Sequence, residues 1–217
     1  LAMVAKMLGI NIELVMPENA SQERVRTMEA FGATVVLTPA NESMEGAIDF
    51  ARQRVLNGCH MLDQFSNQDN PEAHYKTTGP EIWRDTNQKV THFVSAMGTT
   101  GTIMGTSKFL KQQNEAIQII GCQPTPNSNI PGIRRWPKEY LPSIFDPTRV
   151  DRIIDVDEYD ATMTTRLVAA KEGVFCGMSA GGAVWAAAQV AKEIDEGIIV
   201  CIICDKGDRY LSTDLFA

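Results

Sequence analysis

Short apolar runs rich in β-branched residues alternate with amphipathic stretches along almost the whole chain of 217 residues. In the first cycle an apolar run at residues 12–16 ends at Pro17, a helical pattern covers residues 21–31, Gly32 ends it, and a second apolar run follows at residues 34–37. Strands that alternate with helices favour parallel pairing under a cover of helices. We therefore predict an α/β fold with mainly parallel sheets.

The alternation has a seam in the polar turn at residues 64–71, where a short βα lobe gives way to a larger one. We expect residues 1–67 to form the remainder of a smaller N-terminal α/β lobe and residues 68–217 to form a larger C-terminal α/β lobe. Predicted helices cover residues 44–56, 71–83 with a bend at Gly79-Pro80, 102–112, 161–171 and 180–193, and predicted strands cover residues 59–62, 91–96, 117–122, 152–156 and 198–204. Ligands of such sheets bind outside the carboxyl ends of the strands, so the site is expected at a cleft there.

The charge balance favours small molecules as partners. The formal net charge is -7, and the 20 Lys and Arg residues form no stripe. Nucleic acid is therefore not an expected partner. No stretch reaches the ~18 consecutive apolar residues of a membrane helix, so no membrane partner is expected either.

The chain has five cysteines, an odd number: Cys59, Cys122, Cys176, Cys201 and Cys204. Four lie within or beside apolar, strand-like runs, which suits buried thiols in a reducing cytoplasm. Cys201 and Cys204 form a C-x-x-C, a spacing that hints at redox or metal chemistry. On an extended strand this spacing sends the two side chains to opposite faces. We expect buried strand cysteines and no metal site.

A turn rich in glycine and threonine, Gly98-Thr99-Thr100-Gly101-Thr102, joins an apolar strand to a helix. Free backbone N–H groups and the helix dipole favour an anion at such a place, and the hydroxyls can donate further hydrogen bonds. The turn continues neither as a nucleoside-triphosphate loop nor as G-x-G-x-x-G. A phosphate monoester fits it; the alternative is a tight βα turn without a ligand.

A second turn carries Ser179 within Gly177-Met-Ser-Ala-Gly-Gly182 and again precedes a helix. Ser179 could serve as the N-cap of that helix. The order Gly-x-Ser-x-Gly also matches a nucleophile elbow. That fold requires a histidine after the serine, and His60, His74 and His92 all precede it. The hydrolase interpretation therefore fails.

Four motifs together resemble the fold type II pyridoxal-phosphate enzymes of the cysteine synthase (O-acetylserine sulfhydrylase) family, whose fold is tryptophan synthase β-like. They are Gln64-Phe-Ser-Asn67 with Asn70-Pro71, the turn at residues 98–102, the Ser179 turn, and residues 207–213. The likeness covers essentially the entire chain. The threonine in the middle of the first turn and the segment at residues 130–137 resemble cysteine synthase B rather than the A form. That segment lies in a Pro-rich insertion, residues 124–147, which we expect to be a functional surface loop.

The resemblance implies a role for each candidate residue. The phosphate of pyridoxal 5'-phosphate would be held by Gly98, Thr99, Thr100, Gly101 and Thr102. Ser179 would bond the pyridine nitrogen, and Gln64 would lie beside the substrate. Arg134 and Arg135 could meet an anionic sulfur donor such as thiosulfate. Cys204 and Asp205 would lie near the pyridine ring.

By the same resemblance the chain is a transferase of cysteine biosynthesis. It would make L-cysteine from O-acetyl-L-serine and sulfide, or S-sulfocysteine from thiosulfate, as a cytoplasmic homodimer. Two alternatives stay open: a serine or threonine dehydratase of the same fold, and a non-catalytic module that binds a phosphate ligand.

The Schiff-base lysine of this family has no counterpart in the motifs above. It is expected upstream of Leu1, together with the loop that binds the substrate carboxylate. Residues 1–8 have helical spacing without an N-cap, as in the second half of a helix. We therefore assign no catalytic lysine among residues 1–217 and expect this chain alone not to turn over.

Overall fold

The computed structural model describes residues 1–217 and divides the chain into two compact units. The first contains Leu1–Leu62 together with Asp208–Ala217, and the second contains Asp63–Gly207. The predicted boundary at residue 67 thus differs from the observed one, and the C-terminal segment belongs to the smaller unit rather than the larger. The hydropathy pattern could not reveal the contacts that join this segment to helix α2 (Gln22–Ala30). Arg24 donates a hydrogen bond to the hydroxyl of the buried Tyr210, and Ser212 donates two to the Glu23 carboxylate.

The first unit is built on a two-stranded parallel sheet. Its elements are α1 (Ala2–Leu8), β1 (Glu13–Pro17), α2 (Gln22–Ala30), β2 (Thr34–Thr38) and α3 (Ser43–Leu56). The strands pair in register from Glu13 with Thr34 to Pro17 with Thr38. The predicted strand at residues 59–62 is wrong. Gly58 adopts a φ of 91° and the Cys59 amide bonds Arg54 O, which ties the start of that segment to the end of α3.

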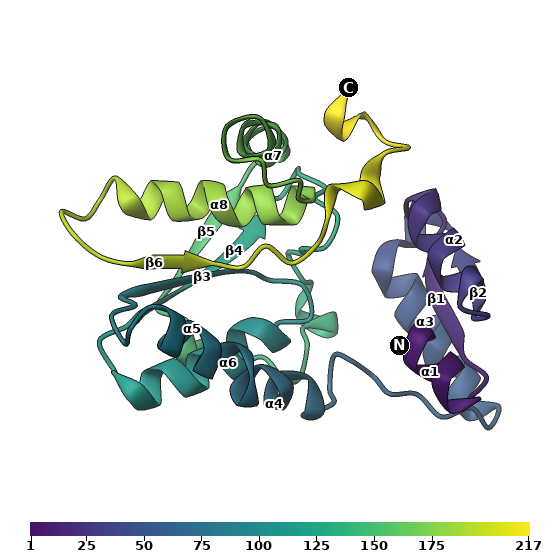
Figure 1. The fold of residues 1–217 in the computed structure, drawn as a ribbon. Helices are drawn as coiled ribbons and strands as arrows, with labels where there is room; N and C mark the ends of the chain where they lie inside the picture. The colour runs from purple at the N-terminus through teal and green to yellow at the C-terminus, as the bar shows by residue number, and fades with distance from the viewer. The chain divides into compact units, whose positions relative to one another are not determined.

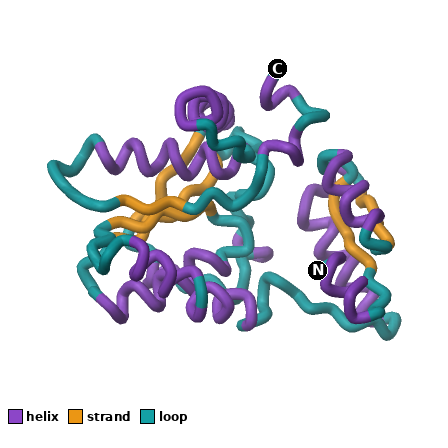
Figure 2. The backbone as a smooth tube through the Cα atoms, viewed as in Figure 1, coloured by secondary structure: helices purple, strands orange, loops and turns teal.

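The second unit is a four-stranded parallel sheet between two layers of helices (Figures 1 and 2). In chain order it comprises α4 (Asp69–Lys76), α5 (Thr78–Asp85), β3 (His92–Ala96), α6 (Gly101–Gln113), β4 (Gln118–Pro124), β5 (Arg152–Val156), α7 (Glu158–Glu172), α8 (Met178–Ala191) and β6 (Ile199–Cys201). The strand order is β5-β4-β3-β6. Helices α4, α5 and α6 cover one face and α7 and α8 the other. None of the helices is both long enough and apolar enough to cross a membrane. The predicted α/β class with parallel sheets is confirmed.

The two faces of this sheet carry separate hydrophobic cores, because neighbouring residues of a strand point in opposite directions. Phe93 and Ile119 belong to the cluster that α5 and α6 complete. Val94 and Ile120, each the next residue along its strand, belong to the cluster that α7 and α8 complete. Central strands of a parallel sheet are buried on both faces, which explains their unbroken apolar runs.

The predicted helix at residues 71–83 is two helices, and the break lies at Thr77 rather than at Gly79-Pro80. Thr77 leaves the helical region at φ -123° and ψ -72°. Pro80 lies in the first turn of α5, where its missing N–H costs no intrahelical hydrogen bond. The proline therefore does not bend the chain here.

The expectation of a surface loop at residues 124–147 is wrong for three of its isoleucines. Ile130, Ile133 and Ile144 are buried, and the first two pack in the cluster on the α8 side of the sheet. The segment lacks long regular elements, yet apolar side chains anchor it to the core.

The expectation of buried strand cysteines is wrong for Cys204 and only partly correct for Cys201, which lies in a strand but is half-buried. Strand β6 ends at Cys201, whose partial burial raises the pKa of its thiol. Cys204 lies beyond the strand and is exposed. No disulfide links any of the five cysteines.

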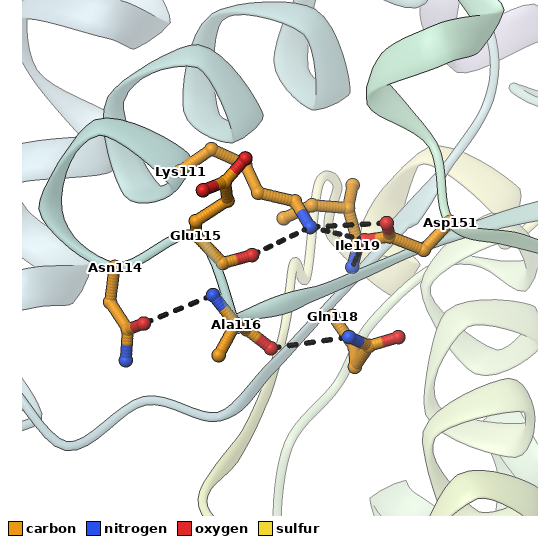
Figure 3. Close-up of polar contacts among 7 residues, drawn as sticks. All are labelled: Lys111, Asn114, Glu115, Ala116, Gln118, Ile119 and Asp151. Carbon is orange, nitrogen blue, oxygen red and sulfur yellow. Dashed lines mark hydrogen bonds and ion pairs between the residues drawn. The ribbon is translucent and has the colours of Figure 1, made fainter.

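Polar contacts fix α6 to the amino end of the sheet (Figure 3). Asp151, just before β5, accepts hydrogen bonds from the Ile119 amide at 2.7 Å and from Lys111 Nζ at 3.1 Å. Lys111 also donates to Glu115 O at 3.1 Å. Because these contacts hold the carboxyl end of α6, the amino end of that helix is directed to the opposite edge of the sheet.

Helices α7 and α8 pack closely at Gly181, and its neighbour Gly182 provides a matched test. A Cβ atom on Gly181 would collide with Thr165 Oγ1 and lie 2.5 Å from Ala161 O, whereas a Cβ atom on Gly182 would meet nothing closer than 3.6 Å. Gly181→Ala should lower the free energy of unfolding by about 2 kcal/mol through overpacking. Gly182→Ala should raise it by up to about 1 kcal/mol, since alanine is the better helix former. Urea unfolding of both variants checks this; equal effects would contradict it.

Candidate functional site

The candidate site lies at the carboxyl end of the central strand β3. Residues 97–100 connect β3 to α6, and the neighbouring strand β6 leads into Cys204. Parallel strands end at one edge of the sheet, so the turns that follow them meet there. The sequence motifs of the second unit converge on this edge.

Thr100 is the unusual residue of the glycine- and threonine-rich turn. It is the N-cap of α6 and adopts φ 71°, a left-handed conformation that is an outlier for a β-branched residue. It is only 3% exposed, and its hydroxyl has no hydrogen-bond partner. Strain and an unsatisfied buried hydroxyl in one residue indicate a functional constraint.

Helix α4 supports this turn through Asn70. Its side-chain amide donates to Thr99 Oγ1 at 3.1 Å and to Gln64 O at 2.8 Å. Any side chain at Gly101 would collide with the Asn70 amide, so a glycine is required there. Asn70 thereby joins the Gln64 turn to the turn at residues 98–102.

His74, one helical turn after Asn70, contacts the same turn at its other end. Its Nε2 lies 3.2 Å from Thr102 Oγ1, and its Nδ1 lies 2.9 Å from Thr78 Oγ1 at the start of α5. Burial of the imidazole lowers its pKa below the ordinary value. The neutral ring is therefore favoured at neutral pH.

The insertion packs against the other side of the turn. Trp136 Nε1 donates to Gly98 O at 2.7 Å, and the Arg134 amide donates to Met97 O at 2.9 Å. Gly132, at φ 96°, lies between two turns. A Cβ atom on Gly98 would lie 2.7 Å from the carbonyl oxygen of Gly132, and a Cβ atom on Gly132 would lie 3.0 Å from the Ser179 hydroxyl.

Ser179 lies within the first turn of α8, and Gly177, not Ser179, is the N-cap. The N-cap alternative for Ser179 is therefore wrong. The serine is 1% exposed, and its hydroxyl lies 3.2 Å from Cys204 Sγ. A thiol is a weak hydrogen-bond partner, so the hydroxyl keeps capacity for a stronger one.

The two arginines of the insertion differ in their surroundings. Arg135 donates to Pro124 O and pairs with Asp155. Burial works to raise the pKa of Asp155, but hydrogen bonds from Gln123 and Arg135 hold it below the ordinary value. The Arg134 guanidinium instead lies 5.3 Å from the centre of the Trp136 ring, a cation–π contact.

The structure thus brings the predicted residues of the second unit together along one chain of contacts. The Gln64 backbone reaches the turn at residues 98–102 through Asn70, and Ser179 reaches it through Gly132. The side chain of Gln64 itself is exposed. Roles for the supporting residues were missed by sequence reasoning: Asn70, His74, Gly132 and Trp136. The i, i+4 spacing of Asn70 and His74 on one helix face was visible, but not what that face contacts.

Comparison with known proteins identifies the family. The sequence pattern described as pyridoxal-phosphate dependent enzyme matches residues 1–205. The chain belongs to this family. Cysteine synthase B of Pseudomonas aeruginosa is 52% identical over 217 residues, which cover 100% of this chain and 73% of that protein. Cysteine synthase B of Escherichia coli is also 52% identical, over 100% of this chain and 72% of that protein. The expected likeness to the cysteine synthase family is confirmed, and the cofactor of this enzyme is pyridoxal phosphate.

Solved structures agree with the fold. The crystal structure of cysteine synthase from Entamoeba histolytica superposes with a TM-score of 0.89 at 34% identity and covers 99% of this chain and 67% of its own. The crystal structure of O-ureido-L-serine synthase gives a TM-score of 0.90 at 32% identity, with 99% and 71% covered. The fold of this pyridoxal-phosphate enzyme is that of the cysteine synthases.

Asn70→Asp should weaken the binding of pyridoxal phosphate about tenfold or more. The carboxylate cannot donate to Thr99 and Gln64, and it adds a negative charge beside the expected phosphate position. Fluorescence titration of the apoprotein with the cofactor measures the change. Asn114→Asp is the control, since it adds the same charge at the other end of α6 and can still accept from the Ala116 amide. Equal affinities of the two variants would contradict the role of Asn70.

Proposed function

We propose that the turn at residues 98–102 holds the phosphate of pyridoxal phosphate, and that the enzyme makes L-cysteine from O-acetyl-L-serine and sulfide. The observation that carries the proposal is Thr100, strained, buried and without a partner for its hydroxyl at the amino end of a 13-residue helix. A bound phosphate would satisfy that hydroxyl and offset the strain. The reaction is inferred from the pyridoxal-phosphate family and from the relatives named cysteine synthase B.

The donors of the turn suit a phosphate group. The threonines at positions 99, 100 and 102 offer hydroxyls, and Gly98 and Gly101 let the backbone approach a ligand closely. The first N–H groups of α6 have no partner within the helix, and the helix dipole adds positive potential there. None of the threonines in the turn forms a hydrogen bond with a side-chain carboxylate.

Ser179 would hold the pyridine nitrogen. Its hydroxyl is buried beside the weak thiol partner Cys204. A serine cannot protonate the ring as an acidic partner would, which favours elimination and replacement at the β-carbon. When bound, pyridoxal phosphate supplies the electron sink for loss of the α-proton and of the acetate group. We assign no lysine among residues 1–217 to the Schiff base.

The substrate is proposed to lie near Gln64, whose exposed side chain is joined through its backbone and Asn70 to the phosphate turn. Arg134 is proposed to bind an anionic sulfur donor such as thiosulfate, giving S-sulfocysteine. Its planar guanidinium is stacked near Trp136 and suits an oxyanion. We further propose that the enzyme works as a homodimer in the cytoplasm, where an absence of disulfides among its five cysteines is expected.

The test uses the protein at its full natural length. The visible absorption of bound pyridoxal phosphate should change when O-acetylserine is added, and sulfide should then yield L-cysteine as acetate is released. Pyruvate formed without any sulfur donor would instead favour the dehydratase. Cofactor binding with no spectral response and no product would favour a non-catalytic module.

Thr100→Gly should raise the stability of the apoprotein and weaken the binding of the cofactor. Glycine accepts φ 71° without strain and removes the unsatisfied hydroxyl, so the apoprotein should gain about 1 kcal/mol of unfolding free energy. Cofactor affinity should fall about tenfold with the lost donor. Gln88→Gly is the control, because Gln88 also has a positive φ, 63°, but lies in the loop after α5. It should gain some stability and keep full affinity. Unchanged cofactor affinity in Thr100→Gly would refute the assignment.

Arg134→Gln should raise the KM for thiosulfate about tenfold and leave the KM for sulfide nearly unchanged, because only the larger oxyanion uses the guanidinium fork. Arg135→Gln is the matched control, since Arg135 is already paired with Asp155. Steady-state kinetics with both donors decide the matter. A proportional loss with sulfide and thiosulfate would contradict this role for Arg134.

A further inference from the structure

We propose that His74 and Thr78 are positioning residues that fix the direction of the Thr102 hydroxyl, so that its proton faces the bound phosphate. The inference rests on the proposed function, in which Thr102 is one of the phosphate donors. It adds His74 from α4 and Thr78 from α5 to the residues that support the turn at residues 98–102.

Three elements meet at the imidazole of His74. Nε2 lies 3.2 Å from Thr102 Oγ1 in the first turn of α6, and Nδ1 lies 2.9 Å from Thr78 Oγ1 in the first turn of α5. The ring therefore bridges two hydroxyls, one in the phosphate turn and one behind it. Both of its nitrogens are occupied by partners in the chain.

Close packing brings the ring to this position. A side chain at Gly105 would collide with Pro71 O and lie 2.7 Å from His74 Cβ, so α4 approaches α6 at a glycine. Gly79 plays the same part for α5, since a Cβ atom there would lie 2.7 Å from Phe109 Cβ. The break at Thr77 starts α5 with Thr78 and places its hydroxyl four residues after His74.

A neutral imidazole has one donor and one acceptor, so the bridge has two possible directions. In the first, Thr102 donates to Nε2 and Nδ1–H donates to Thr78. In the second, Thr78 donates to Nδ1 and Nε2–H donates to Thr102. Only the second leaves the Thr102 proton available for another acceptor.

The dianion of a phosphate monoester such as pyridoxal phosphate has only acceptor oxygens, so it selects the second direction. Thr102 must then donate to the phosphate and accept from Nε2–H, which requires Nδ1 to accept from the Thr78 hydroxyl. Burial lowers the pKa of His74 and favours the neutral ring to which this choice applies. His74 thus acts on the phosphate through Thr102 and does not touch it.

The direct test is the tautomer of His74 in the protein at its full natural length, labelled with 15N at histidine. In the holoenzyme, and in the apoprotein saturated with inorganic phosphate, Nε2 should carry the proton and Nδ1 should show the 15N shift of an unprotonated nitrogen that accepts a hydrogen bond. In Thr78→Val, Nδ1 loses its donor, and the signal should change toward a mixture of the two tautomers.

Affinity measurements supply a second, independent readout. His74→Leu should bind pyridoxal phosphate about tenfold more weakly. The variant loses the hydrogen bond to Thr102, the hydroxyl proposed to donate to the charged phosphate, and one such bond is worth about 1.4 kcal/mol. His74→Gln should recover most of that loss, because its amide can donate to Thr102. Thr78→Val should lose about threefold. His92→Gln is the matched control: His92 also contacts a threonine hydroxyl, Thr91 Oγ1 at 2.8 Å, but lies at the amino end of β3.

The outcomes distinguish the two proposals. If wild-type protein binds neither pyridoxal phosphate nor phosphate at this turn, the proposed function fails and the positioning role fails with it. If the cofactor binds and shifts the amides at residues 98–102, yet Nδ1 of His74 carries the proton, the positioning role alone is overturned. Equal affinity losses in His74→Gln and His74→Leu, at unchanged urea midpoints, would also overturn it.

Discussion

The close approach of α4 to α6 is the contact on which the candidate site depends. It is possible only because Gly101 and Gly105 present no side chain to α4, where Asn70 and the backbone of Pro71 fill the space. With the helices at this distance, Asn70 and His74 reach the two ends of one turn. A larger residue at either glycine would move α4 away and remove both contacts together. Close helix packing here serves the site as well as the core.

The turn itself is held in a conformation that its own residues disfavour. Thr100 keeps a left-handed backbone and a buried, unsatisfied hydroxyl, each of which costs about 1–3 kcal/mol. The contacts that hold it come from outside the turn: Trp136 bonds Gly98 O, and Met97 is tied to the Arg134 amide. A ligand that satisfies the hydroxyl would therefore meet a turn whose backbone these contacts already hold, which lowers the entropic cost of binding.

Sequence reasoning was strongest where one short stretch determines its own structure. The alternation of strands and helices predicted the parallel sheet, and the apolar run before residues 98–102 and the helical pattern after them placed that turn between a strand and a helix. It was weakest where the decisive partner lies far along the chain. The pairing of Arg24 with Tyr210, the burial of Ile130 and the contact of His74 with Thr102 join segments that no local pattern relates. Cys204 shows the same limit, because β6 pairs with β3 only as far as Cys201, whereas the apolar run in the sequence continues to Cys204.

Gly132 couples parts of the site that the sequence keeps well apart. Its backbone lies against Gly98 on one side and against the Ser179 hydroxyl on the other, and φ 96° together with the lack of a Cβ atom makes this possible. Arg134 follows two residues later, with its amide bonded to Met97. The backbone that separates the turn at residues 98–102 from Ser179 therefore also sets the position of the arginine that we propose binds the sulfur donor. The proposed binding of the cofactor and the proposed binding of the sulfur donor could vary independently on separate loops. Here both depend on the position of Gly132.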